Sequence, residues 1–190
     1  MFTEHLPVQE IQREVTGSER LLWSGMPRQG IFFSGADLFL IPFSLMWGGF
    51  AFFWEYQAVT QGAPFFFLIW GIPFVLVGIY FIVGRFFVDA RQRRATYYGL
   101  TDQRVIIISG IFTRKVKSLN LWTLSDISLT EKSDRSGTII LGPSNPWASM
   151  YMGMSWPGVP RTDTFVGVTD AKKIYDMIRS AQARQSKQVG

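Results

Sequence analysis

Two long stretches of the chain are apolar on every side. They occupy residues 31–54 and 65–87, and only two charged residues, Asp37 and Glu55, interrupt this part of the chain before position 85. A membrane-spanning helix needs roughly 20 mostly apolar residues, and core helices of soluble proteins are rarely apolar all round over that length. The pattern therefore predicts a transmembrane helical hairpin over residues 31–87.

The positions of the basic residues predict how this hairpin is oriented. The connector at residues 55–64 contains no Lys or Arg, whereas Arg20 and Arg28 lie upstream of the hairpin. Four arginines flank its downstream end: Arg85, Arg91, Arg93 and Arg94. By the positive-inside rule, both termini lie in the cytoplasm of an inner-membrane protein. The same four arginines either serve topology alone or also bind anionic lipid headgroups.

Downstream of the hairpin the pattern changes to short β-branched runs between turn residues. Strands are predicted at residues 95–100, 104–109, 111–121, 126–132, 138–142 and 164–168, with a tight hairpin turn at Ser109–Gly110. A helix follows, because an apolar stripe recurs at helical spacing: Ala171, Ile174, Tyr175, Ile178 and Ala181. This stripe can cover the sheet face that a run of hairpins leaves open. The apolar island at residues 18–25 is either an isolated strand or an interfacial anchor.

The order of these elements resembles a known family. The matching stretches are ERLLWSGMPR (19–28), YYGLTDQRVIIISGIFTRKVKSLNL (97–121) and FVGVTDAKKIYDMIRSAQ (165–182), and the most diagnostic part is Tyr98 through Gly110. They are similar to the membrane-anchored bacterial pleckstrin-homology-like (PH) domain family. The resemblance implies an α+β membrane protein, in which a two-helix transmembrane hairpin precedes a PH-like β-sandwich or barrel capped by a C-terminal helix.

We divide the chain accordingly into four parts. Residues 1–30 form a cytoplasmic N-terminal segment, 31–87 the hairpin, 88–183 the cytoplasmic PH-like domain, and 184–190 a flexible polar tail. The motifs of the family are structural and imply no particular chemistry, so lipid binding by other proteins of the fold is only an analogy here.

Composition and charge narrow the possible functions. The net charge is +5, and from Arg85 onward 16 basic residues stand against 8 acidic ones. A basic domain beside a membrane favours anionic headgroups as partners over nucleic acid, for which no binding motif is present. The chain has no cysteine, and His5 is its only histidine, so neither a catalytic triad nor a histidine or thiolate metal site is expected. We predict no enzymatic activity, no cofactor and no metal.

Several other residues are candidates for packing or partner contact. Ser44, Gly48, Gly71 and Gly78 have the small side chains that let helices approach closely, either within the hairpin or in a homo-oligomer. Asp37 and Glu55 are interpreted as acids at helix ends, and Arg114, Lys115 and Lys117 as a solvated strand face. The irregular segment 143–163 is rich in large apolar residues: Trp147, Met150, Tyr151, Met152, Met154 and Trp156. These pack inside the domain, insert at the bilayer interface, or contact a partner subunit.

These patterns together predict a non-catalytic membrane-anchored module at the cytoplasmic face of the membrane. Its function is protein interaction, self-assembly or anionic-lipid binding, with membrane lipids and either its own copies or another membrane protein as partners. The alternative is an accessory or assembly subunit of a larger membrane enzyme or transporter.

Overall fold

The computed structural model describes residues 5–30, 37–142 and 163–189, and it divides into two compact units. Among the described residues, the first unit combines 5–30 with 90–142 and 163–189, and the second contains 37–89. The sheets therefore belong with segments on both sides of the apolar helices, and not only with the downstream part of the chain.

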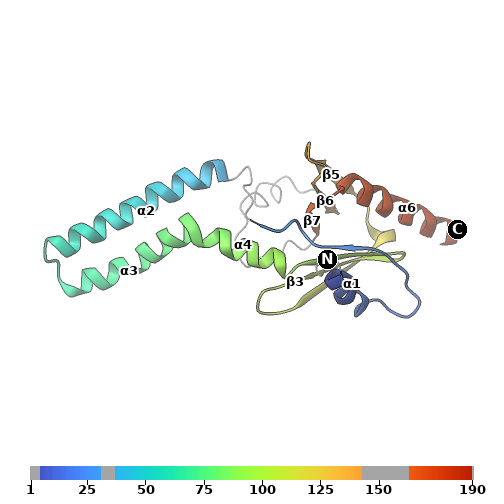
Figure 1. Ribbon diagram of the computed structural model, residues 1–190, viewed down its shortest axis with the longest axis horizontal. Helices are drawn as coiled ribbons and strands as arrows, with labels where there is room; N and C mark the ends of the chain where they lie inside the picture. The colour runs from blue at the N-terminus through green and yellow to red at the C-terminus, as the bar shows by residue number, and fades with distance from the viewer. Residues whose placement is uncertain (1–4, 31–36, 143–162, 190) are drawn as a thin grey trace. The chain divides into compact units, whose positions relative to one another are not determined.

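The first unit is built on two antiparallel sheets (Figure 1). The strands of the first sheet, in spatial order, are β1 (Leu21–Gly25), β2 (Tyr97–Thr101), β3 (Arg104–Ser109) and β4 (Lys115–Asn120). Those of the second are β5 (Ile127–Glu131), β6 (Gly137–Leu141) and β7 (Thr164–Val168). A short 3₁₀ helix, η2 (Leu121–Thr123), connects β4 to the second sheet. In the described part of the unit the sheets are accompanied by helices α1 (His5–Gln12) and α6 (Ala171–Val189).

Helix α6 covers the core of this unit with the predicted stripe. Ala171, Ile174, Ile178 and Ala181 are buried in one cluster with residues of both sheets, and Tyr175 packs at its margin. The amphipathic helix expected from the sequence is therefore confirmed. It is also longer than expected, because it continues to Val189 through the segment predicted as a flexible tail.

Helix α1 covers the opposite face of the first sheet, which the sequence interpretation left without a cover. Alternate side chains of β3 point to opposite faces. Ile107 joins the main core, while Ile106 and Ile108 pack with Ile11 of α1. A Cβ atom at Gly99 would lie 2.5 Å from the Ile11 side chain, so this glycine makes room for the helix. The unbroken apolar run of β3 is typical of a strand buried on both faces.

The apolar island near residue 21 is strand β1, which pairs antiparallel with β2. Gly25 lies opposite Tyr98, and Ser24 lies opposite Gly99. The two strands are neighbours in space although residues 26–96 separate them in the chain. The long apolar helices are therefore an insertion between two paired strands of one sheet.

The second unit contains two helices that are long and apolar enough to cross a membrane, Asp37–Thr60 and Phe65–Arg94. The first is α2. The second comprises α3 (Phe65–Ile79), a π-helical turn, η1 (Tyr80–Gly84), and α4 (Arg85–Arg94), whose last residues belong to the first unit. Helix α2 continues beyond its apolar run and is followed by Gly62, whose φ of +65° suits a residue just after a helix end.

The turn between β3 and β4 corrects another expectation. Ser109 pairs with Lys115, so the connection is the five-residue turn 110–114 and not a tight turn at Ser109–Gly110. Gly110 has a φ of +132°, and a side chain there would overlap the carbonyl oxygen of Thr113. The predicted strand residues Ile111 and Phe112 therefore lie in the turn, outside the ladder.

Candidate functional site

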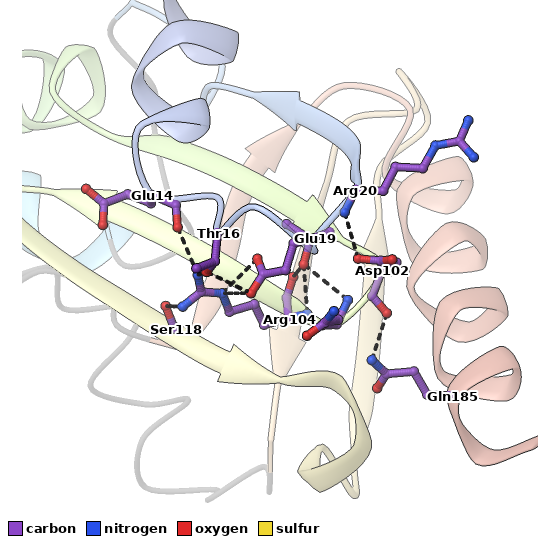
Figure 2. A network of polar contacts seen from close by, with 10 residues as sticks. Glu14, Thr16, Glu19, Arg20, Asp102, Arg104, Ser118 and Gln185 are labelled. Atoms are coloured by element: carbon purple, nitrogen blue, oxygen red, sulfur yellow. Dashed lines mark hydrogen bonds and ion pairs between the residues drawn. The ribbon is translucent and has the colours of Figure 1, made fainter. Parts of the chain in front are cut away.

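A polar network attaches the segment that precedes β1 to the first sheet (Figure 2). The Arg104 guanidinium donates hydrogen bonds from Nε to the Glu19 carboxylate (3.1 Å) and from Nη2 to the backbone carbonyl of Glu14 (2.8 Å). It also reaches the hydroxyls of Thr16 and Ser118. The Glu19 side chain is only 8% exposed, so this ion pair is largely shielded from water. One arginine of β3 thereby holds the chain in place just before it enters β1.

The turn after β2 contributes a second attachment. The Thr101 side-chain oxygen accepts a hydrogen bond from the backbone N–H of Arg104 (2.9 Å), which closes the turn. The Asp102 carboxylate accepts the backbone N–H of Arg20 (2.9 Å), and its backbone carbonyl accepts the side-chain amide of Gln185 (2.8 Å; Figure 2). The turn therefore ties β1, the first sheet and the end of α6 together.

Tyr98 connects the two sheets. Its ring stacks on Phe165 with centroids 4.5 Å apart, and its hydroxyl accepts the backbone N–H of Val166 in β7 (3.1 Å). Tyr98, Thr101, Asp102 and Arg104 all belong to the stretch from Tyr98 to Gly110, which was the most diagnostic part of the sequence. Their contacts are packing and hydrogen bonds within the unit. These residues therefore have structural roles in the described part of the chain.

Arg85 pairs with Asp37 and is not directed at solvent. Its Nη1 lies 2.9 Å from Asp37 Oδ1, and the two side chains are 13% and 10% exposed. The guanidinium also lies 4.5 Å from the ring centroid of Phe86. Arg85, one of the four candidate lipid-binding arginines, therefore joins the start of α2 to the start of α4. The sequence could have predicted this ion pair, because Asp37 and Arg85 carry opposite charges and lie at the same end of the predicted antiparallel hairpin.

The other three candidate arginines lie in the first unit, near the end of α4. Arg91 and Arg94 are exposed and line an open groove of about 460 Å³, a size within the range of about 300–1,000 Å³ typical of small-molecule sites. Arg93 is half-buried, and its backbone carbonyl accepts the side-chain amide of Gln29 (3.3 Å). Arg91 and Arg94 are therefore the two candidate arginines that are exposed and line the groove, unlike Arg85 and Arg93.

The β3–β4 turn contributes to the same groove. Gly110, Ile111 and Arg114 line it together with Glu10 of α1 and the two arginines of α4. Arg114 is already engaged, because its guanidinium lies 2.7 Å from the Glu14 carboxylate and 3.6 Å from that of Glu10. The sequence analysis interpreted Arg114 and Lys117 as part of a solvated strand face. It missed the ion pairs of Arg114 and also the pair that Lys117 forms with Asp163.

The small residues of the apolar helices are buried in the hairpin, where Gly48 of α2 faces Gly78 of α3. Ser44, Gly48, Gly71 and Gly78 are all buried. A Cβ atom on Gly78 would lie 3.0 Å from the Cα atom of Gly48, and one on Gly71 would overlap the Glu55 carboxylate. The hairpin itself uses these close approaches.

The remaining predicted candidates lie outside the described residues. Trp147, Met150, Tyr151, Met152, Met154 and Trp156 all fall in 143–162, and the His5 side chain is likewise not described. Within the described residues, no three His, Asp or Glu side chains gather as a metal site. At the β5–β6 turn, hydrogen bonds from the side chain and backbone N–H of Ser136, with a smaller effect of Arg28, lower the pKa of Asp134 to about 2.

Comparison with protein families finds a match to the family described as bacterial PH domain, over residues 38–182. The match begins in α2 and ends in α6, so it includes both long apolar helices, while α1 and β1 lie outside it. A search of curated proteins finds no similar sequence.

Proposed function

Because the chain belongs to the bacterial PH domain family, we propose that it is a non-catalytic, membrane-anchored module. Its transmembrane hairpin holds the sheet unit at the cytoplasmic face of the inner membrane, where the unit binds anionic lipid headgroups and presents a surface for protein interaction or self-assembly. The family resemblance inferred from the sequence is confirmed, and the membrane topology and the ligand are the parts proposed here.

The pairing of β1 with β2 is the observation that carries this proposal. Hydrogen-bonded neighbours of one sheet occupy the same compartment, so the chain that leaves β1 and returns to β2 crosses any membrane an even number of times. The insertion between them contains two helices of spanning length and composition. A hairpin with both ends on one side satisfies both conditions.

The exposed side chains of the two helices support the proposal that these helices lie in lipid. Their buried residues are mostly small, whereas large apolar side chains point outward: Leu38, Phe39, Leu45, Met46, Phe50, Phe53, Phe65, Phe66, Ile69 and Trp70 are all more than half exposed. Helices that are apolar all round are stable when lipid or protein covers them. In water the same surface would favour aggregation.

The charges support a cytoplasmic sheet unit. Basic residues flank the hairpin and are absent from its connector, the pattern that the positive-inside rule expects when both ends of the hairpin are cytoplasmic. Arg91 and Arg94 are exposed at the end of α4, six and nine residues beyond Arg85. Basic residues at such positions attract anionic headgroups with about 1 kcal/mol each.

Cysteine labelling tests the topology, because the natural chain has no cysteine. Single cysteines at Thr60 and at Ser186 are treated with a membrane-impermeant maleimide outside intact cells. We expect labelling at position 60 and protection at position 186 until the cells are lysed.

A chain with Thr113→Cys serves as a second cytoplasmic reporter, since this residue is exposed in the β3–β4 turn. Labelling at 186 and 113 without labelling at 60 would reverse the orientation. Equal labelling of all three positions in intact cells would contradict a spanning hairpin.

A further inference from the structure

The β3–β4 turn exposes a large apolar side chain beside cationic ones. Phe112 is 98% exposed, which makes it the most exposed large apolar residue in the described part of the chain. The sheet unit buries most of its other apolar side chains in two cores. The position of Phe112 is set by the backbone, because Gly110 turns the chain with a φ of +132° that other residues rarely adopt. The aromatic ring is thus held at the tip of a turn whose base is part of the sheet.

The groove next to this turn carries two arginines of α4, Arg91 and Arg94, and one acid, Glu10. Within the residues that the structure describes, neither Arg91 nor Arg94 pairs with an acidic side chain, whereas Arg114 pairs with Glu10 and Glu14. Tyr97 of β2 and the buried Ile108 of β3 also line the groove. Glu10 pairs with Arg13 and Arg114, so the groove offers two available positive charges on α4, next to the turn that exposes Phe112.

We propose that this groove and turn form a binding site for the headgroup of an anionic phospholipid. Arg91 and Arg94 bind the phosphate by charge-assisted hydrogen bonds, while Phe112 inserts among the acyl chains beside that headgroup. The inference rests on the proposed function, because it requires the hairpin to span the membrane. Of the four arginines that the sequence offered, it keeps Arg91 and Arg94, leaves out Arg85 and Arg93, and adds Phe112.

The combination of features selects a lipid over a soluble anion. A soluble phosphate would be bound by the arginines alone and would give an exposed phenylalanine no partner. Helix α4 also follows an apolar helix directly in the chain, so Arg91 and Arg94 come soon after the proposed spanning segment. Their charges act on headgroups within a Debye length, about 8 Å at physiological salt.

A fluorophore at the tip of the turn provides the test. The full chain carrying Phe112→Cys, its only cysteine, is labelled with a polarity-sensitive dye and reconstituted in nanodiscs. The lipid is either phosphatidylcholine alone or an equal mixture with phosphatidylglycerol. We expect the emission to shift to the blue in the mixture, because the anionic headgroup draws the tip into the bilayer.

Two matched charge variants identify the groove as the cause. Arg91→Gln with Arg94→Gln should abolish the shift and, in the chain with Phe112 intact, lower the preference for co-purified phosphatidylglycerol by roughly 30-fold, the factor that corresponds to about 1 kcal/mol for each arginine. Arg179→Gln with Arg184→Gln removes the same charge from exposed positions on α6 and should retain both effects.

The possible outcomes separate the inference from the proposal on which it rests. Emission that is the same in both lipids, or a lipid preference that the Arg91 and Arg94 variant leaves intact, overturns the inference while the membrane anchor stands. A blue shift produced by glycerol phosphate added to phosphatidylcholine nanodiscs overturns it in favour of a soluble anion. A chain that does not enter nanodiscs, and whose position 60 is not labelled in cells, overturns both.

Discussion

The two units use the same apolar residue types in opposite ways. In the sheet unit Leu100, Ile106 and Phe165 are fully buried, whereas in the hairpin Leu38 and Phe65 are 86% and 76% exposed. The buried residues of α2 are Asp37, Ser44, Gly48 and Ala51, which are small or polar. Apolar burial drives water-soluble folding, while helices in lipid associate through close packing of small residues and through polar contacts. This difference is what the proposed membrane anchor requires, with the sheet unit in water and the hairpin in lipid.

A substitution in the core of the sheet unit should give the largest effect. Ile178 of α6 is completely buried, so Ile178→Asp places an unpaired carboxylate in the core at a cost of several kcal/mol. We expect the sheet unit to become protease-sensitive in detergent while the hairpin still inserts. Limited proteolysis with detection of the membrane-protected fragment measures both.

An exposed position on the same helix provides the control for this change. Lys173→Asp also introduces an acid into α6, but this residue is exposed and should leave protease resistance unchanged. If the Ile178→Asp chain were as resistant as the natural one, the apolar stripe of α6 would not be what stabilises the sheet unit.

A substitution in the hairpin should give an intermediate effect. Gly78→Leu adds a side chain where a Cβ atom already lies 3.0 Å from the Gly48 backbone, so the helices must separate, at a cost of about 1–3 kcal/mol. Disulfide formation between cysteines introduced at Ser44 and Ile82, compared before and after the change, would measure the separation.

Gly49→Leu is the matched control, because nothing lies within 4 Å of a Cβ atom at this position. It adds the same side chain one residue away, on the outer surface of α2. Equal crosslinking in the two leucine variants would argue against packing of α2 on α3 through Gly48 and Gly78.

The smallest effect is expected at an exposed turn of the sheet unit. The pKa of Asp134 is lowered to about 2 in the folded chain, chiefly by the side-chain and then the backbone hydrogen bond from Ser136, against about 4 when unfolded. The ionised carboxylate therefore stabilises the fold fully above about pH 4, and this contribution is lost as the pH falls toward 2.

Ser136→Ala removes the side-chain donor, so the pKa of Asp134 should rise toward its unfolded value and the loss of stability between pH 4 and 2 should shrink. An NMR titration of the Asp134 carboxyl group in detergent reports this pKa directly. The same titration midpoint in both chains would show that the backbone N–H and Arg28 suffice without the hydroxyl.

The candidate site was only partly predictable from the sequence. The cluster of arginines after the hairpin is evident from composition, but the availability of Arg91 and Arg94 depends on which residues pack beside them. Arg85 looks equivalent in the sequence, and only the position of Asp37 at the start of the other helix removes it from the site. Phe112 belongs to an apolar run that predicts a strand, and the five-residue turn alone places it in solvent.

The sequence by itself determined the elements whose pattern is local. Two apolar runs of spanning length and the helical stripe of α6 follow from the chemistry of neighbouring residues, because the 3.6-residue period and the length of an apolar run are read within one segment. The tertiary structure alone decided that β1 pairs with β2 across the inserted hairpin, and that α1 covers the outer face of β3. Such pairings join segments far apart in the chain, and their free energy comes from surfaces that meet only when the chain has folded.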